Sequence, residues 1–93
     1  MIVSFRDTET ERIWRGEFSR KLPQDIQQTA LRKLRMLNNA RVLRDLAVPP
    51  NNQLEALKGD RAGQHSIRIN QQWRICFVWT EGGPDHVETV DYH

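Results

Sequence analysis

The strongest constraint on the fold is a stretch near the end of the chain in which apolar and polar residues alternate. The apolar side of this alternation within residues 66–80 consists of Ile67, Ile69, Trp73, Ile75, Phe77 and Trp79. A period of two is typical of extended strands with one buried face. We expect two antiparallel strands joined by a tight connection at residues 70–72, and a wider connection at residues 81–85 that leads into a last strand at residues 87–93. Residues 65–93 are therefore predicted to form a three-stranded meander.

The first half of the chain carries a helical pattern instead. Thr8 and Glu11 have the spacing of a capping box before a short helix, which Gly16 can end. Pro23 takes a favoured first helical position in a longer helix, whose apolar stripe recurs every three or four residues until residues 38–39 break it. The stripe consists of Ile26, Ala30, Leu34 and Leu37.

These patterns together predict an α+β fold. Residues 1–5 are short, apolar and β-branched, so we expect them to open the chain as a strand. A meander needs cover on one face, and the amphipathic helices are the cover available. The expected architecture is an N-terminal strand and a helix pair packed on one face of a small, mainly antiparallel sheet, with the other face left free for function. With 93 residues, of which 38% are hydrophobic, residues 1–93 are expected to form a single domain.

The composition limits which cellular compartment and which classes of partner we expect. Charged residues make up 28% of the chain and no long apolar run is present, so we expect a cytoplasmic protein with no membrane partner. The one cysteine, Cys76, agrees with a reducing compartment. Residues 1–46 carry a net charge of +4 and residues 47–93 a net charge of −2. The basic half suits a polyanion or an acidic partner, although a solvated helix face explains the same excess.

Two arginines are predicted to meet on the free face of the sheet. Arg68 and Arg74 share a polar parity on adjacent strands. Two guanidinium groups side by side repel each other unless an anion bridges them, and phosphate does so with bidentate geometry. The structural alternative is an ion pair with an acidic side chain, for which the candidates are Asp60, Glu88 and Asp91. The residues alone leave both interpretations open.

A further polar cluster ends the chain. Asp91, Tyr92 and His93 offer an acceptor, a phenolic donor and an imidazole with an ordinary pKa of about 6.5, which suits proton transfer near neutral pH. The alternative is a strand with a solvated polar end. Metal-ligand spacings and glycine-rich phosphate loops are not recognisable, so we expect no metal and no cofactor. Metal-free chemistry on phosphate remains, in which a base deprotonates a ribose 2′-hydroxyl, arginines stabilise the phosphorane and an acid protonates the 5′ oxygen.

The stretch LKGDRAGQHSIRINQQWRICFVW, followed by the terminal VDYH, resembles the HigB branch of the RelE/ParE toxin superfamily, and most of all its GraT-like HigB toxins. The shared features occur in the family's order over essentially the whole chain. The resemblance implies a RelE-like fold and an endoribonuclease toxin that cleaves messenger RNA in the ribosomal A site. It also implies neutralisation by a HigA-type helix-turn-helix antitoxin, with operator DNA bound only through that antitoxin.

The resemblance also implies which residues act. The catalytic candidates that match by position are Lys58, Arg74, Asp91, Tyr92 and His93. Arg61 and Arg68 are the candidates for binding RNA. Glu55 is a departure, because some members of the family carry a histidine there. Either Glu55 replaces that imidazole as general base, or His93 acts as the base while Asp91 holds its tautomer.

Two other functions stay open from the sequence. One is a ParE-like inhibitor that shares the fold but poisons a topoisomerase by binding, without chemistry. The combination of Arg74 with the terminal acid, phenol and imidazole argues against it. The other is an interaction domain whose basic helices bind an acidic partner.

Overall fold

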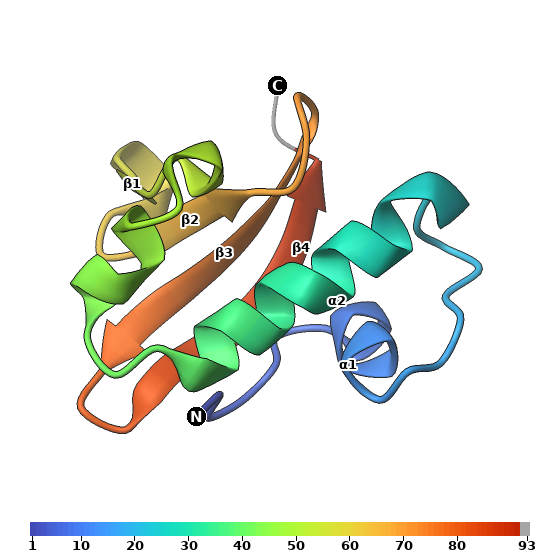
Figure 1. The fold of residues 1–93 in the computed structure, drawn as a ribbon, viewed down its shortest axis with the longest axis horizontal. Helices are drawn as coiled ribbons and strands as arrows, with labels where there is room; N and C mark the ends of the chain where they lie inside the picture. The colour runs from blue at the N-terminus through green and yellow to red at the C-terminus, as the bar shows by residue number, and fades with distance from the viewer. Residues whose placement is uncertain (92–93) are drawn as a thin grey trace.

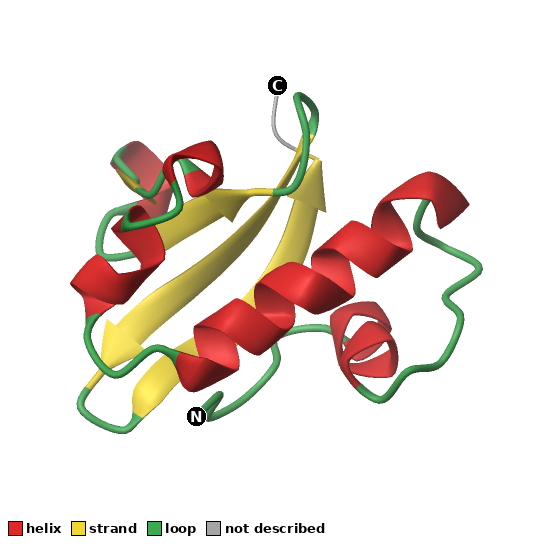
Figure 2. Ribbon diagram, viewed as in Figure 1, coloured by secondary structure: helices red, strands yellow, loops and turns green. Residues whose placement is uncertain are grey.

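The computed structural model of the chain describes residues 1–91, in which two α-helices accompany a four-stranded antiparallel sheet (Figures 1 and 2). The helices and strands are α1 (Thr8–Trp14), α2 (Gln24–Asn39), β1 (Glu55–Ala56), β2 (His65–Arg68), β3 (Trp73–Thr80) and β4 (Gly83–Asp91). Short 3-10 helices, η1 (Leu43–Ala47), η2 (Pro50–Asn52) and η3 (Gly59–Arg61), lie in the connections. The predicted α+β class is confirmed. The predictions for Tyr92 and His93 lie outside the described residues.

The first helix forms where the sequence predicts it, with a different cap. Asp7 has an extended backbone and its carboxylate accepts a hydrogen bond from the Thr10 N–H at 3.0 Å, which makes Asp7 the N-cap. The capping box expected from Thr8 and Glu11 is therefore wrong. Gly16 has a φ of +83° and its N–H donates to the Ile13 carbonyl, so it ends the helix as predicted.

The second helix begins and ends one or two residues away from the prediction. Pro23 is the N-cap rather than the first helical residue, and the helix continues through Asn38 and Asn39 instead of breaking there. Asn38 is held by a tertiary contact, because its Oδ1 accepts the Ile2 N–H at 3.0 Å. That contact stabilises a helical turn that asparagine disfavours on local grounds. Neither α1 nor α2 has the length and the apolar run that crossing a membrane requires.

The expected N-terminal strand is reduced to one bridge. Phe5 pairs with Val87 in a parallel sense, and the Val3 and Arg6 N–H groups donate to carbonyls of β4 at 2.7 and 2.9 Å. Pairing is short because β4 bulges here: His86 adopts a φ of +52°, and two residues of β4 face one residue of β3. The prediction of a regular strand at residues 1–5 is wrong, although the segment does run along the sheet edge.

The sheet has one strand more than the predicted meander. Its order is β1-β2-β3-β4, and every neighbouring pair is antiparallel. The added strand, β1, precedes the predicted meander. The last strand begins at residue 83, earlier than expected, because Gly83 takes a φ of +122° beside the backbone of Met1, where any other side chain would collide.

Both helices pack on one face of the sheet, as predicted (Figure 1). Ile26 and Leu34 of α2 and Ile13 of α1 form one buried cluster with Ile67 of β2 and Ile75 of β3. These strand residues alternate with polar ones that point away from the helices. We call the opposite side, which carries Glu55, Ser66, Arg68, Arg74, Cys76, Glu88 and Val90, the outer face.

Candidate functional site

The outer face is organised as two rows of side chains that cross the sheet. In the first row Glu55 pairs with Ser66, Ser66 with Cys76, and Cys76 with Glu88. The second row consists of Arg68, Arg74 and Val90. The strand register therefore brings a carboxylate of β1, a serine and a cysteine of the two central strands and a carboxylate of β4 into one line, with two arginines beside it.

Arg68 and Arg74 are directly opposed across β2 and β3, so the predicted meeting of two arginines is confirmed. Arg68 is half-buried and its Nε donates to the Asn70 carbonyl at 3.1 Å, in the turn that joins the two strands. Like charges at directly opposed positions destabilise an antiparallel pair.

Arg74 is buried, with 8% of its surface exposed, and it donates hydrogen bonds to a hydroxyl and to a backbone carbonyl. Its Nε donates to Ser66 Oγ at 2.7 Å and its Nη2 to the Gln53 carbonyl at 2.6 Å. The guanidinium therefore leans over β2 toward the segment that precedes β1. Charge-assisted hydrogen bonds of this kind fix the plane of the guanidinium, which is a condition for bidentate contact with phosphate.

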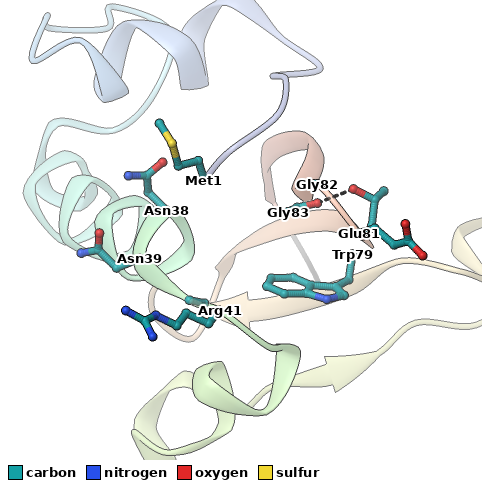
Figure 3. Close-up of a pocket in the computed structure, with 10 residues that line it drawn as sticks. Met1, Asn38, Asn39, Arg41, Trp79, Glu81, Gly82 and Gly83 are labelled. Carbon is teal, nitrogen blue, oxygen red and sulfur yellow. Dashed lines mark hydrogen bonds between the residues drawn. The ribbon is translucent and has the colours of Figure 1, made fainter.

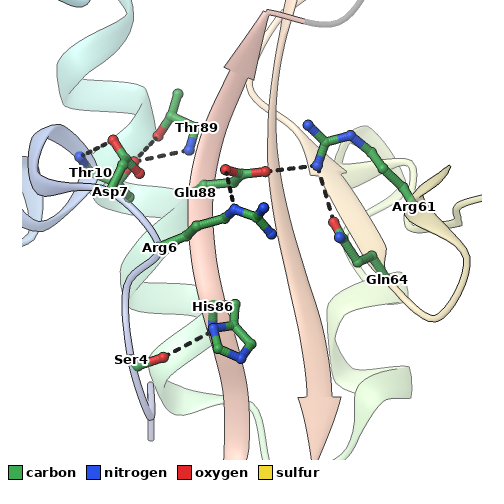
Figure 4. A network of polar contacts seen from close by, with 9 residues as sticks. All are labelled: Ser4, Arg6, Asp7, Thr10, Arg61, Gln64, His86, Glu88 and Thr89. Carbon is green, nitrogen blue, oxygen red and sulfur yellow. Dashed lines mark hydrogen bonds and ion pairs between the residues drawn. The ribbon is translucent and has the colours of Figure 1, made fainter.

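Glu88, one of the acids that we considered for pairing with Arg68 and Arg74, forms ion pairs with Arg61 and Arg6 (Figure 4). Arg61 Nη1 lies 2.7 Å from Glu88 Oε1 and 3.1 Å from Gln64 Oε1, while Arg6 Nε lies 3.5 Å from Glu88 Oε2. The carboxylate thus ties η3 and the N-terminal segment to β4. This contact places Arg61 over the same face as Arg74.

Cys76 lies beneath this group of charges and has no exposed surface. Burial raises the pKa of the Cys76 thiol; the charges of Arg61 and Arg74 act to lower it, and those of Glu88 and Glu55 to raise it. The strand register places Cys76 opposite Glu88 and two positions from Arg74, on the same face. A thiol buried in this way is expected to pack rather than react.

The segment at residues 54–61 presents its charged side chains outward. Leu57 is buried and its N–H donates to the Gln64 carbonyl at 2.9 Å, which anchors the segment to the start of β2. Glu55 and Lys58 are exposed, and within residues 1–91 neither side chain makes a hydrogen bond or an ion pair. Both remain available to a ligand on the outer face.

Asp91, at the end of β4, stands apart from this group. It pairs with Trp73 in the strand register, whereas Arg74 pairs with Val90, so the alternation places Asp91 on the side opposite Arg74. Its carboxylate accepts from Gln72 Nε2 at 3.1 Å. Tyr92 and His93, the other members of the predicted terminal cluster, lie outside the described residues. The structure therefore brings together Glu55, Arg61, Arg68 and Arg74, and leaves the terminal cluster a prediction.

Two groups at the site were missed by the sequence reasoning. Ser66 shares the strand parity of Arg68, so the register of the sheet would have identified it. Gln53 acts through its backbone carbonyl, which leaves no signal in the amino-acid sequence. Within residues 1–91, no group of three His, Cys, Asp or Glu side chains is placed to hold a metal ion.

A cleft of about 670 Å³ lies at the other end of the sheet (Figure 3). Asn38 and Asn39 line it from the end of α2, Trp79 from β3, and Gly82 and Gly83 from the hairpin. Trp79 lies five positions along β3 from the buried Arg74, or about 16 Å. Of the residues predicted to act, none of those within residues 1–91 lines this cleft.

Comparison with known proteins gives a consistent result. The family model for the RelE-like toxin of type II toxin-antitoxin system HigB matches residues 3–93. The chain is 36% identical over 83 residues to Toxin HigB-1 of Vibrio cholerae serotype O1. The matched region covers 88% of this chain and 87% of that protein. It is also 34% identical over 76 residues to an uncharacterized protein of Haemophilus influenzae, covering 81% of this chain and 75% of the relative.

Proposed function

Because the chain belongs to the HigB family of RelE-like toxins of type II toxin-antitoxin systems, we propose that it is an endoribonuclease that cleaves translated messenger RNA on the ribosome. An antitoxin is the partner that such a system implies. We propose a HigA-type helix-turn-helix protein in that role, with operator DNA bound through it alone. Cleavage in the cytoplasm would stop translation and growth.

The opposed pair of Arg68 and Arg74 is the observation that carries this proposal. Like charges at directly opposed positions repel each other, and an RNA phosphate between the two guanidinium groups would offset that repulsion. The fixed guanidinium of Arg74 suits the developing charge on a phosphorane, because preorganised donors stabilise a transition state without reorganising. Arg68 and Arg61, both closer to solvent than Arg74, suit the neighbouring phosphates of the strand.

Roles are proposed for the other polar groups as well. Lys58 is exposed beside η3 and supplies a further positive charge to the phosphate. Glu55 lies two residues after Gln53, whose carbonyl binds Arg74, so its carboxylate is on the side toward which the guanidinium leans. Glu55 or His93 is the proposed general base, and Tyr92 and Asp91 support proton transfer at the end of the chain.

Mapping of messenger RNA ends tests the proposal. After brief induction of the toxin, primer extension on a reporter message should show new 5′ ends that follow the reading frame. The matched control is the same message with its start codon destroyed, which should stay intact because no ribosome translates it. Induction of the Arg74→Lys variant provides a second control at equal protein level.

Two outcomes would contradict the proposal. Equal cutting of the translated and untranslated messages would show a nuclease that does not need the ribosome. Growth arrest without any new RNA ends would instead favour inhibition by binding, as in the ParE-like alternative, and a topoisomerase assay would then identify the target.

A further inference from the structure

A chain of buried polar contacts links α2 to Arg74, and the proposed mechanism does not use it. Lys33 of α2 has only 6% of its surface exposed, and its ammonium group donates to Oδ1 of Asn52. Burial lowers the pKa of Lys33, and the charges of Arg32 and Arg68 add to this. Because burying an ammonium group costs free energy unless it is hydrogen-bonded, the contact with Asn52 is a condition for packing Lys33 here.

Asn52 uses both ends of its amide. Its surface is fully buried; while Oδ1 accepts from Lys33, Nδ2 donates to the Leu46 carbonyl at 3.0 Å and lies 3.8 Å from Met36 Sδ. The side chain is thereby fixed from α2 and η1 together. Aspartate would lose the donor and leucine would lose both groups, so asparagine is the residue that satisfies both neighbours.

The next residue, Gln53, holds an unusual backbone conformation. Its φ and ψ are 45° and 57°, in the left-handed region that non-glycine residues seldom adopt. Its side chain is exposed, whereas its carbonyl accepts the hydrogen bond from Arg74 Nη2 at 2.6 Å. Such strain persists where the surroundings fix the backbone, and here Asn52 fixes it on one side and Arg74 on the other.

We propose that Asn52 is a positioning residue for the RNA cleavage reaction. Held by Lys33 and the Leu46 carbonyl, it keeps Gln53 left-handed, and the Gln53 carbonyl then orients the Arg74 guanidinium toward the scissile phosphate. The inference rests on the proposed function, since it assigns a role within that reaction. It also makes α2, on the far side of the sheet, part of the support for a group on the outer face.

A pair of substitutions at Gln53 tests the backbone step. Gln53→Gly and Gln53→Val delete the same exposed amide, but glycine adopts a positive φ readily and valine does not. We expect single-turnover cleavage on ribosomes by Gln53→Val to be about 10- to 100-fold slower than by Gln53→Gly, because small misplacements of a catalytic group have effects of that size. Equal rates in the two folded variants would overturn the proposal.

A second variant tests Asn52 itself. Asn52→Ala should lower the maximal cleavage rate by about 10- to 100-fold while leaving KM within about twofold of its normal value. The ¹⁵N signal of Arg74 Nε, assigned by its loss in Arg74→Lys, should shift in the same variant because the guanidinium is no longer held in one orientation.

Ser19→Ala is the matched control. Ser19 is also fully buried and uses its hydroxyl on both sides, with Glu9 Oε1 at 2.7 Å and the Lys21 N–H at 3.2 Å, but it lies in the connection between the helices. The Ser19→Ala substitution should leave both the cleavage rate per folded molecule and the Arg74 signal unchanged. An Asn52→Ala variant that behaves like Ser19→Ala in either measurement would refute the positioning role. If the wild-type protein itself cut no message, the proposed function would be wrong, while the Arg74 signal would still decide whether Asn52 orients that guanidinium.

Discussion

Replacing Arg74 with lysine separates a role in folding from a role in chemistry. The substitution keeps the positive charge but removes the planar fork that donates to Ser66 Oγ and to the Gln53 carbonyl. A lysine ammonium on a flexible stem can replace at most one of these contacts in the same place. The other acceptor is then left without its donor.

The structure sets the size of both effects. A hydrogen bond from a charged donor contributes about 1.5–3 kcal/mol, so loss of one of the two should lower the free energy of unfolding by roughly that amount. For a domain of this length each kcal/mol shifts Tm by about 4–8 °C, which predicts a decrease of roughly 6–24 °C. If Arg74 also stabilises the phosphorane, a further 2–4 kcal/mol appears in the barrier, or about 30- to 900-fold in rate.

The assay compares two variants well below their melting transitions. Thr10→Val is the matched control, since Thr10 is fully buried and its hydroxyl makes two hydrogen bonds of 2.9 Å with Thr89, on the helix side of the sheet. Both variants should lose stability in thermal unfolding. In single-turnover cleavage on ribosomes, the Arg74→Lys rate per folded molecule should fall by the predicted factor and the Thr10→Val rate should not. Equal rates for the two variants would refute the assignment of Arg74 to the reaction.

Three further predictions concern other parts of the chain. Glu55→Gln should change the single-turnover rate by no more than a few-fold, because an exposed carboxylate is a weak base; a collapse of the rate with normal ribosome binding would identify Glu55 as the general base. Deletion of His93 should leave thermal unfolding unchanged and slow cleavage by about 10²- to 10⁴-fold, and wild-type cleavage by the folded deletion would exclude it from the mechanism. Asp45 accepts the backbone N–H groups of Arg41 and Val42, which hold the pKa of its carboxyl below the ordinary 3.8. A depressed carboxyl pKa stabilises the fold above about pH 4 and loses this effect as the pH falls through the lowered value. The Tm difference between wild type and Asp45→Asn should therefore be constant near neutral pH and shrink in acid, whereas a difference independent of pH would contradict the assignment.

Much of the fold follows from periodicity in the sequence. The stripe that includes Ile26 and Leu34 predicts the second helix and its buried side, and the alternation through Ile75 predicts the central strand. At the N-terminus, the prediction failed because of a contact between distant segments. The N-terminal segment meets β4 beside the bulge at His86, and that meeting limits its pairing to one bridge at Phe5. Local sequence does not encode such a meeting.

The candidate site divides in the same way. Parity along two neighbouring strands predicted that Arg68 and Arg74 share a face, because side chains alternate regularly and the hairpin between them is short. The partners of the charged groups could not be predicted. Arg74 binds a serine hydroxyl and a backbone carbonyl, and Glu88 pairs instead with Arg61 of η3.

By itself the sequence determined the fold class, the buried faces of the helices and strands, and the meeting of two arginines on one face. Each of these follows from local periodicity, which is set by the geometry of the backbone. Only the tertiary structure decided that Glu55 belongs to a strand, that Glu88 ties Arg61 and Arg6 together, and that the Gln53 carbonyl holds Arg74. These contacts join residues from different elements, and their formation depends on strand register, a left-handed backbone and burial, which exist once the chain has folded.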